Sequence, residues 1–133
     1  MSIVANVAST VVGFGSVILM FRIQRELQMR DKNETSWIAY SDWLVIVAMI
    51  MAGSLGLALP LSIRWFQLTK FPAAACSSSV ILLIGYVFAI LAHYRLILGR
   101  GRRGRRKNPE PAEKVLISIF GVLATDVFFS SLA

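Results

Sequence analysis

The apolar residues of this chain gather in four long runs that short polar connections separate. The runs cover residues 3–21, 43–63, 73–98 and 115–133. An α-helix rises about 1.5 Å per residue, so about 20 apolar residues cross a hydrocarbon core about 30 Å thick. The pattern therefore predicts an all-α integral membrane protein, a bundle of four transmembrane helices forming a single membrane domain over residues 1–133.

The first run has a rival interpretation as a secretory signal peptide. Such a peptide has a positively charged start, a shorter apolar stretch and a cleavage site with small residues. Here Met1 and Ser2 carry no charge, and the first cation, Arg22, follows the apolar run. We therefore expect residues 3–21 to be retained as the first transmembrane helix.

The cations of the connections are distributed unevenly. Of the 14 lysines and arginines, only Arg64 and Lys70 belong to the second connection. The others lie in the first and third connections or at the adjoining end of the third run. Cytoplasmic loops of membrane proteins are enriched in lysine and arginine. The distribution predicts that both termini lie on the non-cytoplasmic side.

Residues 99–114 form the predicted cytoplasmic basic loop. Glycine, proline and like charge are dense in it, which favours a solvated segment. We expect its cations to fix orientation and to contact anionic lipid headgroups, with binding of a specific lipid or acidic partner as the alternative. No aromatic side chain stands among them to stack on bases, so no nucleic-acid partner is expected. The cations concerned are Arg100, Arg102, Arg103, Arg105, Arg106 and Lys107.

Small residues recur at four-residue spacing in the first three apolar runs. Residues four apart lie on one helix face, and small side chains let two backbones approach closely in lipid. These residues either pack the four helices against one another or dock on a second copy or another membrane protein. The helix-packing candidates are Ala5, Ser9, Gly13, Ala48, Ala52, Gly56, Gly85 and Ala89.

Groups for catalysis or for binding a metal or a cofactor are scarce. The single histidine, His93, and the single cysteine, Cys76, both belong to the third run. Their separation along a helix is about 25 Å, too far for one metal ion. We therefore predict no catalytic, cofactor-binding or metal-binding residues, and we expect that the protein is not an enzyme.

Asp126 is the only acid within the apolar runs. A charged side chain at the centre of a membrane helix costs about 2.5–3.5 kcal/mol on insertion scales, so intramembrane acids are usually protonated, paired or hydrated. Asp126 is thus a candidate proton-binding, ion-binding or helix-contact site, with Asn6 and Arg64 as possible partners. The alternative is that Asp126 reaches water at the outer end of a short helix.

These features favour an accessory, structural or assembly subunit of a larger membrane complex. The alternative is a homo-oligomeric small transporter, channel or pore that uses Asp126. The expected partners are membrane lipids, together with other membrane subunits or further copies of the chain. The identity of the membrane is not encoded in these patterns.

Overall fold

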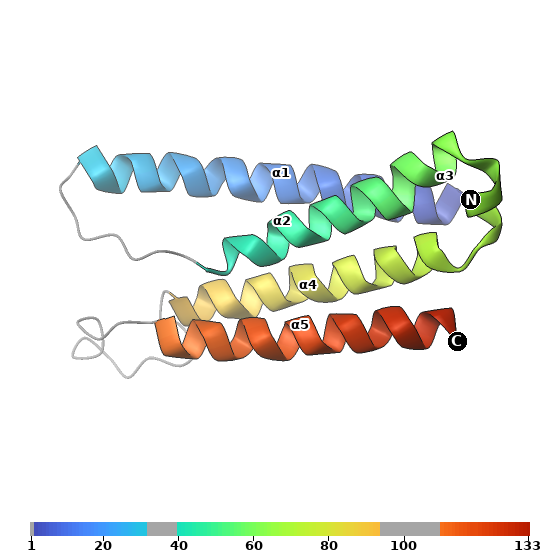
Figure 1. Ribbon diagram of the computed structural model, residues 1–133. Coiled ribbons are helices and arrows are strands. Elements are labelled where there is room, and N and C mark those ends of the chain that lie inside the picture. The colour runs from blue at the N-terminus through green and yellow to red at the C-terminus, as the bar shows by residue number, and fades with distance from the viewer. Residues whose placement is uncertain (1, 32–39, 94–109) are drawn as a thin grey trace.

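The computed structural model describes residues 2–31, 40–93 and 110–133, which are helical apart from short turns (Figure 1). Four of its helices are long and apolar enough to cross a membrane, as the sequence predicts. The elements in chain order are α1 (Ser2–Asp31), α2 (Asp42–Met51), η1 (Ala52–Ala58), α3 (Leu59–Ser62), η2 (Arg64–Leu68), α4 (Phe71–His93) and α5 (Glu110–Leu132).

The long helices run alternately in opposite directions along one axis (Figure 1). The start of α1 and the end of α5 lie together at one end of the molecule, which we call the termini end. The opposite end carries Arg22, Asp42, His93 and Glu113, and we call it the polar end. Which end faces the cytoplasm stays a prediction from the distribution of cations.

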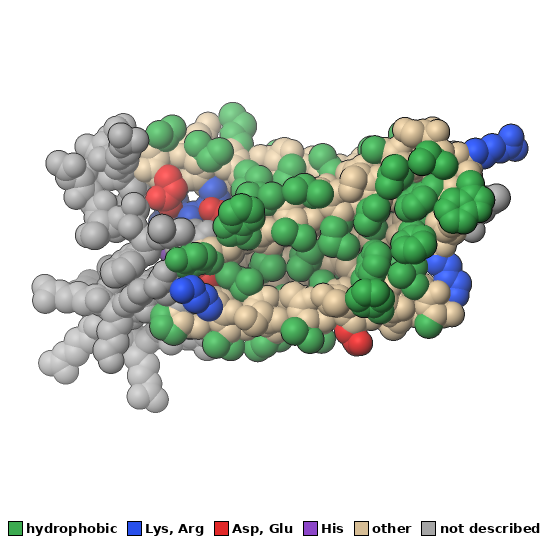
Figure 2. Space-filling view, viewed as in Figure 1, with side chains coloured by type: hydrophobic (Ala, Val, Ile, Leu, Met, Phe, Trp, Pro, Cys, Tyr) green, Lys and Arg blue, Asp and Glu red, His purple; other side chains and the backbone are tan. Residues whose placement is uncertain are grey.

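Hydrophobic side chains cover the visible side of the molecule between its two ends (Figure 2). Charged side chains gather near the ends, apart from an acidic side chain over α5. This distribution fits a protein whose sides face lipid and whose ends face water, in agreement with four helices that are long and apolar enough to cross a membrane.

The helices form a packed group of three with the fourth at its side. Helix α4 contacts α1, the helix that α2 and η1 form, and α5. Among the described elements, α4 is the only one against which α5 packs extensively. Half of the apolar window of α4 is buried, compared with 6% of that of α5. Most of the surface of α5 is therefore free of contacts within the molecule.

Two of the glycines lie at close approaches between helices. A Cβ atom added at Gly85 of α4 meets the Cβ of Phe120 on α5 at 2.5 Å. A Cβ atom added at Gly56 of η1 meets Cys76 Sγ on α4 at 2.8 Å and Ala8 Cβ on α1 at 3.2 Å. The absence of a side chain at these positions lets the backbones approach, which is the usual basis of helix association in lipid.

The second membrane helix is continuous from Asp42 to Ser62, but its middle part is a π-helix. This π-helical segment, η1, lies directly before Pro60, which has no N–H to donate to the preceding turn. Irregular helical turns are commonly found where the normal hydrogen-bond ladder is interrupted. Wider helical turns thus precede Pro60 in the same helix.

Two helices extend further than the apolar runs suggest. Helix α1 continues to Asp31, beyond the predicted end at residue 21, through a segment in which apolar and charged residues alternate. Helix α5 begins at Glu110, before the predicted start at residue 115. The extension of α5 brings Glu113 into the helix, where it faces the interior.

Candidate functional site

A buried polar cluster holds the polar end together, and Glu113 of α5 is at its centre. Its side chain is fully buried, and its Oε2 lies 2.8 Å from Nδ1 of His93 on α4. The backbone N–H of Ser41, at the start of α2, donates to Glu113 Oε1 over 2.6 Å. One carboxylate therefore joins three helices.

A second part of this cluster joins α1 to α2. The Arg22 guanidinium of α1 is 93% buried, and its Nε donates to Asp42 Oδ1 at 3.3 Å. It also pairs with Glu26, one helical turn further along α1, at 3.2 Å. Arginine donates in several directions from one planar group, which suits it to bridging two carboxylates.

The cluster contains a serine, a histidine and an acid, which are the residue types of a nucleophile, a base and an orienting acid in some enzymes. These residues are Ser41, His93 and Glu113. Their arrangement differs from that of such a set, because among the described residues no hydrogen bond joins the buried Ser41 hydroxyl to His93. The base in such a set must be within hydrogen-bonding distance of the nucleophile. No group of three or more metal-ligating side chains occurs among the described residues. The geometry of the cluster therefore fits a structural role, in which its hydrogen bonds hold the helices together.

Asp126 lies on the side of α5 that is turned away from α4. It is exposed, and no described residue forms a hydrogen bond or ion pair with it. Val122 and Phe129, one turn away on either side, are 69% and 64% exposed. Asp126 precedes the end of α5 at Leu132 by six residues, about 9 Å by helix rise. The carboxyl group thus interrupts an apolar surface within the membrane-spanning part of α5.

The two partners predicted for Asp126 do not meet it in the monomer. Asn6 is exposed on α1, and Arg64 is exposed in η2 at the termini end. The neighbouring Ser9 and Gly13 of α1 are exposed as well, and a Cβ atom added at Gly13 meets nothing within 4 Å. The outward side of α1 therefore carries small and polar groups that contact no other helix.

The other small residues predicted to pack helices lie mostly inside the molecule. Ala48, Ala52 and Gly56 are buried on the second membrane helix, and Gly85 and Ala89 are buried on α4. Ala5 is half-buried. The predicted lipid-binding cations at positions 100–107 lie outside the described residues.

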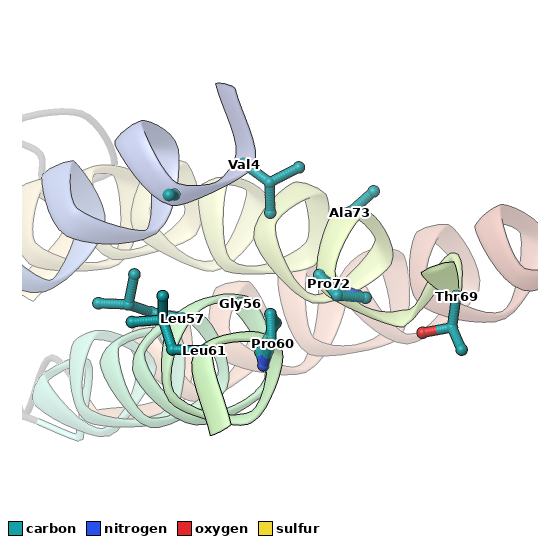
Figure 3. Close-up of a pocket in the computed structure, with 9 residues that line it drawn as sticks. Val4, Gly56, Leu57, Pro60, Leu61, Thr69, Pro72 and Ala73 are labelled. Carbon is teal, nitrogen blue, oxygen red and sulfur yellow. The ribbon is translucent and has the colours of Figure 1, made fainter. Parts of the chain in front are cut away.

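An apolar cavity of about 90 Å³ opens at the termini end between α1, the second membrane helix and α4 (Figure 3). Val4, Pro60 and Pro72 line it, and Thr69 is the only lining residue with a polar side chain. The Thr69 hydroxyl donates to the carbonyl of Phe66 at 2.7 Å. The cavity therefore offers no charged group to a ligand.

The sequence patterns did not single out Glu113 or Asp42. Both stand at the ends of apolar runs, where charged residues usually mark the lipid–water boundary. The one available signal for the contact between His93 and Glu113 was their position near the adjoining ends of two successive spans, which form a helical hairpin. Antiparallel pairing of α4 and α5 brings those ends together.

No protein-family model, no curated protein sequence and no solved structure matches this chain significantly.

Proposed function

We propose that the protein is a structural or assembly subunit of a larger membrane complex, which it joins through the outward side of α5. The observation that carries this proposal is the position of Asp126, exposed on an apolar helix surface without a partner among the described residues. A carboxyl group that faces lipid costs free energy, and a neighbouring protein that supplies hydrogen bonds removes that cost.

The hydroxyl groups of the membrane helices show why Asp126 is different. Thr125 donates to Gly121 O and Ser118 to Lys114 O, each one turn back in the same helix. A hydroxyl is satisfied in lipid by this local bond. An ionised aspartate is an acceptor only, and the backbone N–H groups inside a helix are already used. In its ionised form Asp126 therefore needs a donor from outside its own helix.

Helix α5 is also the least covered of the four spans, with 6% of its apolar window buried. A subunit that binds its neighbours side by side in the membrane needs such an accessible helix. The buried cluster around Glu113 supports the same function, because it fixes α5 to α4 and α2 and presents Asp126 on a rigid surface.

The test compares Asp126→Leu and Asp126→Asn with Thr125→Val, a same-shape change at the adjacent position. The protein is extracted from its native membrane in mild detergent, and the mass of the intact particle is measured. We expect wild type and Thr125→Val in a particle larger than the 14.7 kDa chain. Asp126→Leu should lose that particle, and Asp126→Asn, which retains hydrogen bonding, should lose it only in part. A wild-type protein that runs as a monomer contradicts the proposal.

A homo-oligomeric transporter or pore is the second candidate function. The observation that favours it is again the outward position of Asp126, which would place this carboxyl between copies rather than inside one copy. Here Asp126→Asn should abolish transport or a pH-dependent phenotype while expression and assembly stay normal. Unchanged transport with unchanged assembly argues against this candidate.

A further inference from the structure

We infer that the neighbour of α5 is a second copy of this chain, whose α1 covers Asp126 with Asn6 and Ser9. This inference rests on the second of the two proposed functions, the homo-oligomer, since it names a second copy of the chain as the neighbour of the α5 surface. It follows from the chemistry of the two exposed helix sides, their depth along the bundle axis and their position on the molecule.

The two surfaces are complementary in hydrogen bonding. Asp126 offers acceptor oxygens on α5 and has no partner among the described residues. On α1, Asn6 and Ser9 are exposed, and no described residue hydrogen bonds to either side chain. The amide and the hydroxyl are both donors. The α1 surface therefore supplies hydrogen-bond donors, and the α5 surface supplies an acceptor for them.

The polar groups of the two surfaces lie at the same depth. His93 pairs with Glu113, and α4 and α5 are antiparallel, so counting thirteen residues from each places Asp126 level with Val80. Cys76 Sγ of α4 lies 3.6 Å from Val4 O of α1, and these two helices run in the same direction (Figure 1), so four residues further along Val80 lies near the level of Ala8. Asp126 thus lies near the level of Ala8, between those of Asn6 and Ser9. Copies that share one orientation in the membrane keep this match.

The outward side of α1 also permits a close approach. Gly13 lies one turn beyond Ser9 and is exposed, with open space around an added Cβ. Val122 lies one turn before Asp126 on the opposing helix and is 69% exposed. In an antiparallel contact that brings Asp126 to the level of Ala8, Val122 comes to the level of Val12, next to Gly13. The branched side chain of Val122 then lies beside a position without a side chain.

The position of the two surfaces determines the kind of assembly. Helices α1 and α5 pack on different sides of α4, which lies between them (Figure 1). A contact between different surfaces is heterologous and produces a ring when its rotation closes. A dimer leaves one α1 and one α5 uncovered. The structure therefore favours a closed ring of three or more copies.

The test is disulfide crosslinking between two differently tagged copies, expressed together in a Cys76→Ala background that removes the only natural cysteine. One copy carries Gly13→Cys and the other Val122→Cys. The first control pairs two Val122→Cys copies, and the second pairs Val122→Cys with Val87→Cys, which is 50% exposed on α4. Copper–phenanthroline oxidation of the native membrane is followed by detection of both tags in one band.

We expect the Gly13→Cys and Val122→Cys pair to crosslink at least tenfold more than either control. Native mass of the extracted particle should equal three or more times 14.7 kDa. Strong crosslinking between two Val122→Cys copies overturns the inference in favour of a symmetric α5 contact. No crosslinking, with a particle that still depends on Asp126, overturns it in favour of a different partner and leaves the first proposed function intact. A monomeric particle contradicts both this inference and the proposed function.

A second measurement uses the single-residue changes together. Asn6→Ala with Ser9→Ala, and Asp126→Leu, should each shift the particle toward monomer. The combined variant should shift it no further than the stronger of the two, because both remove the same contact. Independent effects that add up overturn the inference.

Discussion

Glu113 illustrates how a carboxylate is accommodated in the interior of a membrane protein. It is fully buried, yet its two oxygens contact His93 Nδ1 and the Ser41 N–H at 2.8 and 2.6 Å. Removing one partner of a buried pair leaves the other without compensation, which is strongly destabilising. A substitution of Glu113 should therefore lower the stability of the protein mainly because buried groups lose the carboxylate that they contact.

We predict that Glu113→Ala lowers the free energy of unfolding by about 3–5 kcal/mol, because it removes the buried carboxylate that contacts the His93 imidazole and accepts from the Ser41 N–H. Glu113→Gln should cost less, since an amide oxygen still accepts from Ser41. Ser118→Ala, on the exposed side of the same helix, is the control. Unfolding in detergent with increasing denaturant measures all three. Equal midpoints for Glu113→Ala and Ser118→Ala contradict this role.

Asp126 and Glu113 are both acids of α5, but they face opposite surroundings. Glu113 points into the molecule and has partners, whereas Asp126 points outward and has none among the described residues. Rotation around the helix axis separates the two side chains, because thirteen residues do not fill a whole number of turns at 3.6 residues per turn. The same residue type is thus structural at one position and available for assembly at the other.

At the scale of elements, the contact between α4 and α5 depends on Gly85. Phe120 of α5 lies over this glycine, and its ring stacks on Phe88 of α4 with centroids 5.7 Å apart. Phe71 and Phe128 form a tilted ring contact near the termini end, with centroids 6.3 Å apart and an interplanar angle of 50°. Since α5 packs extensively on no other described element, these contacts determine where Asp126 is presented.

We predict that Gly85→Ala destabilises the protein by about 1–3 kcal/mol, because the added Cβ meets Phe120 Cβ at 2.5 Å and overpacks the contact. Gly121→Ala is the matched control on α5, since a Cβ there meets nothing within 4 Å. Thermal unfolding in the same detergent compares the two. An equal loss of stability in both variants argues for a general effect of removing glycine.

At the scale of the whole molecule, the distribution of cations among the connections predicts the orientation in the membrane. The second connection contains Arg64 and Lys70, and the other twelve of the 14 cations belong to the polar end or to the connections next to it. Lysine and arginine near the ends of spans are retained on the cytoplasmic side during insertion. The termini end should therefore face outward.

We predict that replacing Arg102, Arg103, Arg105 and Arg106 by glutamine weakens this orientation and gives a mixture of topologies. A cysteine placed at exposed Ser62 in a Cys76→Ala background reports the side by its reaction with a membrane-impermeant maleimide on intact cells. The parent protein should label fully from outside, and the glutamine variant only in part. If labelling by the maleimide is unchanged and the glutamine variant instead loses its association with anionic vesicles, these arginines serve lipid binding rather than orientation.

Much of the architecture could be predicted from the sequence, because the thickness of the bilayer imposes a length on every apolar span. The four spans and their all-helical nature are confirmed. The side on which each helix packs was harder to predict. Both the lipid-facing and the buried sides of a membrane helix are apolar, so periodicity does not distinguish them. Ser9 and Gly13 show this, since they are exposed while Ala8 and Val11 are buried.

The sequence by itself determined the class of protein, the number of apolar spans and the presence of an isolated acid in the fourth span. Each of these depends only on the order of residue types along the chain. Only the tertiary structure decided that Glu113 meets His93 and that Asp126 faces away from α4, because both depend on which sides of the helices meet. Burial of small residues at Gly56 and Gly85 fixes those sides, and with them the surface left for a neighbour.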